Sequence, residues 1–210
     1  MRWNIKEPPE DLVSSLKKEF NTSHIIAKVM ANRGLKSLES SKDFFSPSFD
    51  QLHDPFMMKN MDISVDRIVQ NIQNKIPILV FGDYDVDGTT GASLLYLGLK
   101  DLNAKVEFYI PDREKEGYGL SAGGIDYAKS IGADLLITCD CGINAFNPVN
   151  YANDLGIGVI ITDHHIPDEK LPNAYAVLNP KQKGCAYPFK GLCGCGVAFK
   201  LISALSEKCG

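Results

Sequence analysis

The chain has 210 residues, with 22 Lys and Arg against 26 Asp and Glu, which gives a formal net charge of −4 with neutral histidines. Its 44% hydrophobic and 23% charged residues exclude a disordered or collagen-like chain and allow one large or two small globular domains. No apolar stretch approaches the roughly 20 residues that cross a bilayer, and the first residues lack a signal-peptide core, so we expect a cytoplasmic protein without a membrane partner.

Residues 1–75 contain no long apolar run and differ in character from the rest of the chain. The apolar spacing over 12–20 and 23–33 predicts two short amphipathic helices, the second with a cap at Ser23 and a stop after it. A further helix over 62–74 leads toward the main domain. We therefore expect a small helical N-terminal segment over residues 1–75.

Residues 76–210 show short apolar runs that alternate with helical segments. Strictly alternating strands and helices, with strands that are almost continuously apolar, predict an α/β fold: a parallel, Rossmann-like sheet with helices on both faces. The expected strands are 78–81, 106–110, 134–138, 159–162 and 176–178, and the expected helices are 90–102, 122–131, 148–155 and 197–206.

Charged side chains follow four of these strands, at the edge of the sheet where parallel α/β folds bind ligands. The strand ends are followed by GDYDVDG at residues 82–88, by Pro111-Asp112-Arg113, by Asp140, and by Asp163-His164-His165. An isolated Asp at such a position is most often only a helix cap, and adjacent histidines are most often solvated. Several carboxylates on one edge, however, repel one another unless cations lie among them. Mixed Asp and His ligands suit Mn²⁺, and their number suits two ions that activate water for attack on phosphorus.

Other ligands and sites fit the sequence poorly. The three aspartates of residues 82–88 resemble a calcium loop, but Leu94 stands where its twelfth ligand should be Glu. The same turn lacks a dinucleotide-binding glycine pattern, and the chain has neither a P-loop nor a Gly-x-Ser-x-Gly elbow. The two Cys-x-Cys pairs have a shorter spacer than structural zinc sites, so we expect buried free thiols there.

The motifs, taken in order, resemble those of the DHH phosphoesterase superfamily: GDYDVDG, Asp140-Cys141-Gly142-Ile143 and Asp163-His164-His165. Within it, PDREKEGYGLS, TCDCGIN, ITDHH and YPFKGLCGCGVAFKL resemble the RecJ-type family of single-stranded-DNA-specific 5′→3′ exonucleases. The resemblance covers most of the chain. It implies a hydrolase of phosphodiester bonds in DNA repair and recombination that acts on single-stranded DNA with two divalent ions, Mn²⁺ first and Mg²⁺ as the alternative.

The resemblance also implies a role for individual residues. Asp83 and Asp85 would each ligate one metal ion, Asp140 would bridge both ions, and His164 would be a further ligand. The residues implied in catalysis are Asp140, Asp163, His164 and His165. The residues implied in substrate binding are Arg113, His165, Lys190, Gly194 and Gly196, and Asp87 and Asp163 would support the ligands from behind.

Two departures from the family pattern affect what we expect of this chain. Cys193 and Cys195 stand where many relatives have Ser and Ala, so a hydroxyl contact to phosphate would be lost. The chain ends at Gly210, before the further Asp ligand and the second domain of RecJ-like proteins. We expect a catalytic-domain fragment with an incomplete metal shell and little or no exonuclease activity.

Two alternative functions stay open from the sequence. One is a DHH phosphodiesterase for short oligoribonucleotides or cyclic dinucleotides, and the other is a non-catalytic DNA-replication scaffold, which would require degenerate motifs. Protein partners from a repair pathway are compatible with the resemblance, and the oligomeric state is open. The net acidity does not exclude nucleic acid, because two divalent ions would cancel it and residues 181–210 hold five Lys against one Glu.

Overall fold

The computed structural model describes residues 4–209, so the first three residues and Gly210, where the sequence suggested an abrupt end, lie outside the described part. The chain forms two compact units, one up to Leu52 and one from His53 onward. The predicted division of the chain between residues 75 and 76 stays a prediction. In the structure, the helix predicted over 62–74 belongs to the second unit.

The first unit is helical, as the sequence predicted. Ser23 caps the second helix with its hydroxyl, which accepts a hydrogen bond from the amide of Ile26 at 3.3 Å. Its small core is formed by Val13, Leu16, Ala27 and Met30. The helices are α1 (Glu10–Glu19), α2 (His24–Asn32) and α3 (Lys42–Phe45), with short 3₁₀ turns at Glu39–Ser41 and Phe49–Gln51.

The second unit is built on a five-stranded, fully parallel sheet with the strand order β2-β1-β3-β4-β5, which confirms the predicted α/β fold. The three central strands are buried at nearly every position, which explains why they are almost continuously apolar in sequence. The strands are β1 (Ile78–Gly82), β2 (Val106–Tyr109), β3 (Leu135–Cys139), β4 (Gly158–Thr162) and β5 (Ala176–Leu178).

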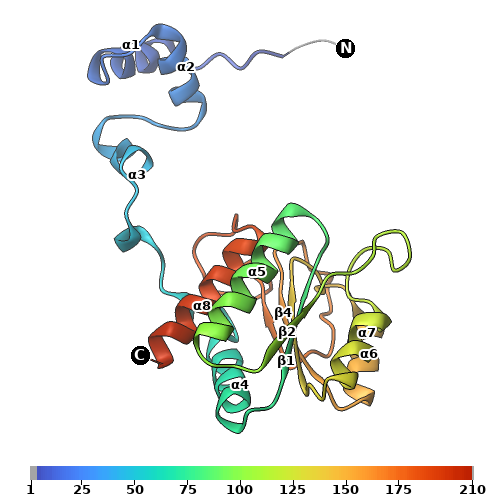
Figure 1. The fold of residues 1–210 in the computed structure, drawn as a ribbon. Coiled ribbons are helices and arrows are strands. Elements are labelled where there is room, and N and C mark those ends of the chain that lie inside the picture. Colours follow the sequence, from blue (N-terminus) through green and yellow to red (C-terminus); the bar gives the residue numbers. More distant parts are fainter. Residues whose placement is uncertain (1–3, 210) are drawn as a thin grey trace. The chain divides into compact units, whose positions relative to one another are not determined.

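Helices cover both faces of this sheet (Figure 1). One core lies between the sheet and α4, α5 and α8, and the other lies between the sheet and α6 and α7. None of the helices in the described residues is long and apolar enough to cross a membrane. The bounds are Pro55–Met57 for a 3₁₀ turn, α4 (Met61–Asn74), α5 (Val86–Asp101), α6 (Ala122–Ser130), α7 (Phe146–Asp154) and α8 (Gly194–Cys209).

Helices α5 and α8 begin a turn or nearly a turn earlier than their apolar spacing predicted. Helix α5 begins at Val86, because the carboxylate of Asp85 caps it by accepting a hydrogen bond from the amide of Gly88 at 2.9 Å. Helix α8 begins at Gly194, because a carboxylate from α5 receives its first amides. The first turns, Val86-Asp87-Gly88 and Gly194-Cys195-Gly196, are glycine-rich and carry no hydrophobic periodicity.

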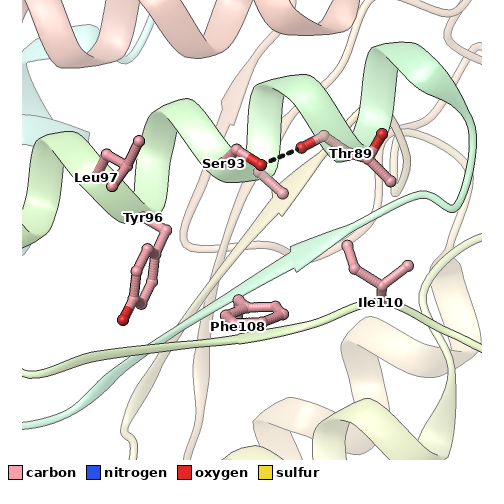
Figure 2. Close-up of a pocket in the computed structure, with 7 residues that line it drawn as sticks. Thr89, Ser93, Tyr96, Leu97, Phe108 and Ile110 are labelled. Carbon is pink, nitrogen blue, oxygen red and sulfur yellow. Dashed lines mark hydrogen bonds between the residues drawn. The ribbon is translucent and has the colours of Figure 1, made fainter.

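An apolar hollow of about 240 Å³ lies between α5 and the edge strand β2, away from the carboxylates (Figure 2). Tyr96, Leu97 and Phe108 line it, and the Ser93 hydroxyl donates its hydrogen bond to the carbonyl of Thr89 at 2.7 Å. Because the lining offers no titratable carboxylate, imidazole or thiol, the hollow is unsuited to the predicted chemistry.

Candidate metal centre

The carboxyl ends of four strands form one row across the sheet, and the next residue of each strand is polar. The strand register aligns Gly82, Cys139, Thr162 and Leu178. One further backbone hydrogen bond continues each ladder, at 3.1, 3.0 and 3.1 Å, from the amides of Asp83, Asp140 and Asp163 to the neighbouring strand. The row of polar residues that results is Asp83, Asp140, Asp163 and Asn179.

Two groups of potential metal ligands meet at Asp140. The first group is Asp83, Asp85 and Asp140, the second is Asp140, His164 and His165, and one ligand atom from each member lies within 4.8 Å of the others. Asp140 is buried and has a left-handed backbone with φ 62°. The structure thus brings together every residue that the resemblance placed on a metal ion.

The donor set fits divalent cations. The Oδ1 atoms of Asp83 and Asp140 are buried without a hydrogen-bond partner, although Nε2 of His164 lies 3.0 Å from the Asp140 atom, so both oxygens are available to a cation. Burial, and then the negative charges of Asp87 and Asp85, raise the pKa of Asp140 to about 7. Burial also raises the pKa of Asp83. Such a cluster of desolvated carboxylates beside imidazoles is stabilised by a hard or borderline cation such as Mg²⁺ or Mn²⁺.

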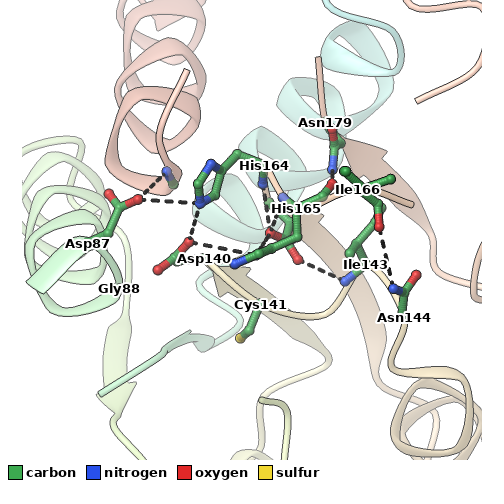
Figure 3. Close-up of polar contacts among 12 residues, drawn as sticks. Asp87, Gly88, Asp140, Cys141, Ile143, Asn144, His164, His165, Ile166 and Asn179 are labelled. Atoms are coloured by element: carbon green, nitrogen blue, oxygen red, sulfur yellow. Dashed lines mark hydrogen bonds and ion pairs between the residues drawn. The ribbon is translucent and has the colours of Figure 1, made fainter. Parts of the chain in front are cut away.

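Asp163 holds the two histidines rather than joining the ligand groups. Its Oδ1 accepts hydrogen bonds from the amides of His164 at 2.7 Å and His165 at 3.1 Å, and from Nδ1 of His165 at 2.7 Å (Figure 3). Its Oδ2 accepts the amide of Ile143 at 3.0 Å. Because an ionised carboxylate only accepts, Nδ1 of His165 carries the hydrogen, and its Nε2 is left to face other groups.

His164 points its Nε2 atom between two carboxylates. This atom lies 3.0 Å from Oδ1 of Asp140 and 3.6 Å from Oδ2 of Asp87. The ring of His165 packs against it, with 4.6 Å between the ring centroids. The two imidazoles therefore lie together beside Asp140.

Asp87 caps helix α8 across the cluster. Its Oδ2 accepts the amide of Gly194 at 2.6 Å, and its Oδ1 accepts the amide of Cys195 at 2.7 Å. Burial acts to raise the pKa of Asp87, but the two amides, together with the Cys193 side chain and His164, outweigh it and the pKa is lowered. Asp87 thus uses both carboxylate oxygens to hold the start of α8, and its support of the metal ligands stays a prediction.

The glycine motif differs in detail from the sequence-based expectation. The amide of Gly194 already donates to Asp87, and the amide of Gly196 donates to Sγ of Cys193 at 3.3 Å. Phosphate binding by these two glycines stays a prediction, and it would require both amides to exchange partners. Cys193 is also exposed, which corrects the expectation that both Cys-x-Cys pairs are buried, although Cys139 and Cys141 are buried.

Aromatic residues that the sequence analysis did not single out extend from the carboxylates to His165. The Tyr84 ring meets the Tyr118 ring edge-on at 6.4 Å, and the Tyr118 ring meets the His165 ring edge-on at 6.2 Å. The Arg113 guanidinium lies over Tyr84, 5.2 Å from its centroid. Arg113 is therefore beside the motif of Asp83. Tyr84 lies within the aspartate motif and Tyr118 within PDREKEGYGLS. Their positions inside these motifs are the sequence signal by which they could have been named as site residues.

The lysines of residues 181–210 do not form one basic patch. Lys200 is 3% exposed and donates to the carbonyl of His53 at 2.7 Å, and Lys208 pairs with Asp66. The Lys190 ammonium donates to the carbonyl of Cys185 at 2.9 Å, and no described contact joins it to the carboxylates. Lys181 does reach the site, since its ammonium contacts the carbonyl of His164 at 2.5 Å. Charge counted along the sequence was therefore a poor guide to its placement in space.

Replacing Gly194 by Ala is expected to weaken metal binding. A Cβ atom at this position would lie 2.6 Å from both Cβ and Oδ1 of Asp140. The start of α8 is fixed by Asp87, so Asp140 would have to move. We expect the dissociation constant for Mn²⁺ to rise roughly tenfold, by analogy with the loss of other groups that orient metal ligands. Electron paramagnetic resonance of free Mn²⁺ measures it. Gly158→Ala is the control, because a Cβ atom there would meet only ordinary contacts. Equal affinities in wild type and Gly194→Ala would contradict the prediction.

Comparison with known proteins agrees with this geometry. Residues 77–209 match the family described as "DHH family, N-terminal domain". Over 205 residues, 98% of this chain, the sequence is 45% identical to the single-stranded-DNA-specific exonuclease RecJ of Bacillus subtilis (strain 168), of which it covers 26%. The chain thus spans about a quarter of that relative's length.

Solved structures show the same similarity. A crystal structure of exonuclease RecJ bound to manganese superposes with a TM-score of 0.67 and 34% identity, covering 73% of this chain and 39% of that one. RecJ from Thermus thermophilus in complex with Mn²⁺ superposes with a TM-score of 0.73 and 27% identity, covering 97% of this chain and 28% of that one.

Proposed function

Because this chain belongs to the DHH family, we propose that it carries the metal centre of a single-stranded-DNA-specific exonuclease. One observation carries the proposal: three strand ends deliver Asp83, Asp140 and the paired histidines into two ligand groups that share Asp140. Relatives named single-stranded-DNA-specific exonuclease RecJ, and structures of RecJ with Mn²⁺, support this choice.

Two ions, Mn²⁺ or Mg²⁺, would be held by Asp83, Asp85, Asp140 and His164. Bound there, divalent ions supply activation of water and neutralisation of the negative charge on phosphate oxygens. Asp140, as the member of both groups, would contact both ions.

His165 is suited to bind the scissile phosphate. Its Nδ1 hydrogen is donated to Asp163, which fixes the ring tautomer and directs the basic Nε2 away from that carboxylate. The side chain is 46% exposed, so substrate can reach it. His165 would donate a hydrogen bond from a protonated Nε2 to a phosphate oxygen, while its Nδ1 stays bound to Asp163.

The surroundings of His165 suit single-stranded nucleic acid. A hollow of about 440 Å³, lined by residues that include Tyr118, Ile143 and His165, lies beside the imidazole. Tyr84 and Tyr118 offer rings against which unpaired bases stack, and Arg113 offers a charge for the phosphate backbone. Base stacking is tolerant of sequence, so low sequence preference is expected.

The test is to place this chain in a relative of known activity. Because the chain is 45% identical to the matching part of the B. subtilis exonuclease, it can replace that part in a chimera. We expect the chimera to degrade single-stranded DNA with Mn²⁺ and to lose this activity in chelator. Preference for di- and trinucleotides of RNA would instead support the small-substrate alternative. A folded chimera that binds Mn²⁺ without cleaving either substrate would contradict the proposal.

Replacing Arg113 by Met in this chimera is expected to weaken DNA binding without altering the metal centre. The guanidinium packs on Tyr84 and has no carboxylate partner among the described residues, so its charge is available to a phosphate. Loss of one phosphate contact should raise KM several-fold and reduce the salt dependence of binding by about one ion. The Mn²⁺ affinity should be unchanged. Lys115→Met is the control, because Lys115 pairs with Asp112, and an unchanged salt dependence in Arg113→Met would count against the role.

A further inference from the structure

The segment with the paired histidines belongs to neither a strand nor a helix, so its main-chain polar groups need other partners. Asp163 accepts the amides of His164 and His165, as described above. The two carbonyls are bound from the opposite side, by residues that follow β5. The backbone that aims the two rings is therefore fixed by side chains alone.

The side chains of Asn179 and Lys181 bind these two carbonyls. Nδ2 of Asn179 donates to the carbonyl of His165 at 2.9 Å, and the ammonium of Lys181 donates to the carbonyl of His164 at 2.5 Å (Figure 3 shows Asn179). Asn179 is fully buried, and its Oδ1 accepts the amide of Lys181 at 2.8 Å. That second bond fixes the orientation of the amide group, with its donor directed at His165.

The place of Asn179 in the fold agrees with such a role. It is the residue after β5 in the same row as Asp83, Asp140 and Asp163. The other three members supply carboxylates to the cluster or to its histidines. Asn179 supplies an amide instead, and its contacts are with main-chain atoms, so it acts on the imidazoles through the backbone.

We propose that Asn179, assisted by Lys181, is a positioning residue that sets the direction of the His164 and His165 rings toward the metal centre. This inference rests on the proposed function for its metal. Loss of an outer partner of a metal ligand typically lowers metal affinity by about 10–100-fold. Asn179 is expected to have an effect of this size although it touches no ligand atom.

The experiment compares Asn179→Ala with Gln182→Ala. Gln182 is a matched control, since it is 3% exposed and its Nε2 donates to the carbonyl of Val177 at 2.6 Å, beside β5 but away from the histidines. We expect both variants to lose stability, but only Asn179→Ala to lose Mn²⁺ affinity, by about 10–100-fold. Equal affinity changes in both variants would show a merely structural role and overturn the inference.

A second readout needs no metal. The chain has four histidines, so imidazole ¹H–¹⁵N spectra of the metal-free protein can separate His164 and His165 from His24 and His53. Asn179→Ala should shift the signals of the first pair and leave those of the second pair in place. If this variant does not fold, Lys181→Met, at an exposed residue, should shift His164 in the same spectra. If the His164 and His165 signals do not move, the inference is overturned. If they move in the variant but the wild-type chain fails to bind Mn²⁺, only the proposed metal centre is overturned.

Discussion

Asp140→Asn is expected to abolish Mn²⁺ binding and, in the same protein, to make the metal-free chain more stable above pH 7. The carboxylate belongs to both ligand groups, so its loss removes a ligand that no other described residue replaces. Asn is the preferred substitute because it tolerates the left-handed backbone of this position, where φ is 62°. Asp140→Ala would add backbone strain and obscure the result.

The sign of the stability change follows from the pKa of Asp140. Burial, followed by Asp87 and Asp85, raises it from 3.8 to about 7 in the folded chain. The folded carboxyl therefore holds its proton more tightly than the unfolded one, and the free energy of unfolding falls as pH rises from 3.8 to about 7. Asn never ionises, so it removes this slope, and we expect a gain on the order of 2 kcal/mol at pH 8.

Urea unfolding in chelator at pH 5 and pH 8 measures this effect, and electron paramagnetic resonance measures Mn²⁺ binding. Glu107→Gln, which neutralises an exposed carboxylate on β2, is the control and should change neither quantity. An Asp140→Asn chain that binds Mn²⁺ like wild type would refute the bridging position. One that is less stable than wild type at pH 8 would refute the raised pKa of Asp140 as a cause of instability. The expected outcome means that this residue contributes to function at a cost in stability.

Asp87→Ala is expected to have the opposite effect and to destabilise the chain strongly. It removes the acceptor of the Gly194 and Cys195 amides and leaves two donors unpaired at the start of α8. Since α8 packs in the same core as α5 and the sheet, we expect a loss of about 2–3 kcal/mol at pH 7.

The pH dependence of this loss is also opposite to that of Asp140. The pKa of Asp87 is lowered because the two amides, together with the Cys193 side chain and His164, outweigh burial, so its stabilisation is present above 3.8 and is lost as pH falls through the lowered value. Urea unfolding at pH 7 and pH 3 should show the variant and wild type approaching each other in acid. Asp87→Asn keeps one acceptor and should lose less. A difference from wild type that is the same at both pH values would show that the carboxylate charge is not the cause.

Much of the fold could be predicted because its signals are local. The buried strands β1, β3 and β4 are short apolar runs, and the alternation with amphipathic helices requires parallel strands. The parallel order then places the residues after Gly82, Cys139 and Thr162 on one edge. For this reason the aspartates and histidines of the candidate site could be named before their distances were known.

Other features depend on pairs of residues that are far apart in sequence. Asp87 and Gly194 are separated by 107 positions, and only their contact shows that a glycine amide expected for phosphate already has a partner. Asn179 follows a three-residue strand and carries no pattern, yet it lies in the row of the aspartates. The early start of α8 was missed for the same reason, whereas α5 is capped locally by Asp85 and its first turn lacks the apolar spacing that was used to place helices.

The sequence by itself determined the parallel α/β architecture, the sheet edge on which the aspartates and histidines gather, and the residues that could hold divalent ions. These follow from side-chain periodicity and from the type of residue after each strand. Only the tertiary structure decided that Asp87 caps α8, that the Gly194 amide already has a partner, and that Lys181 is the lysine that reaches the histidines. Those roles depend on desolvation and on hydrogen bonds formed when separate segments meet, and neither exists along an extended chain.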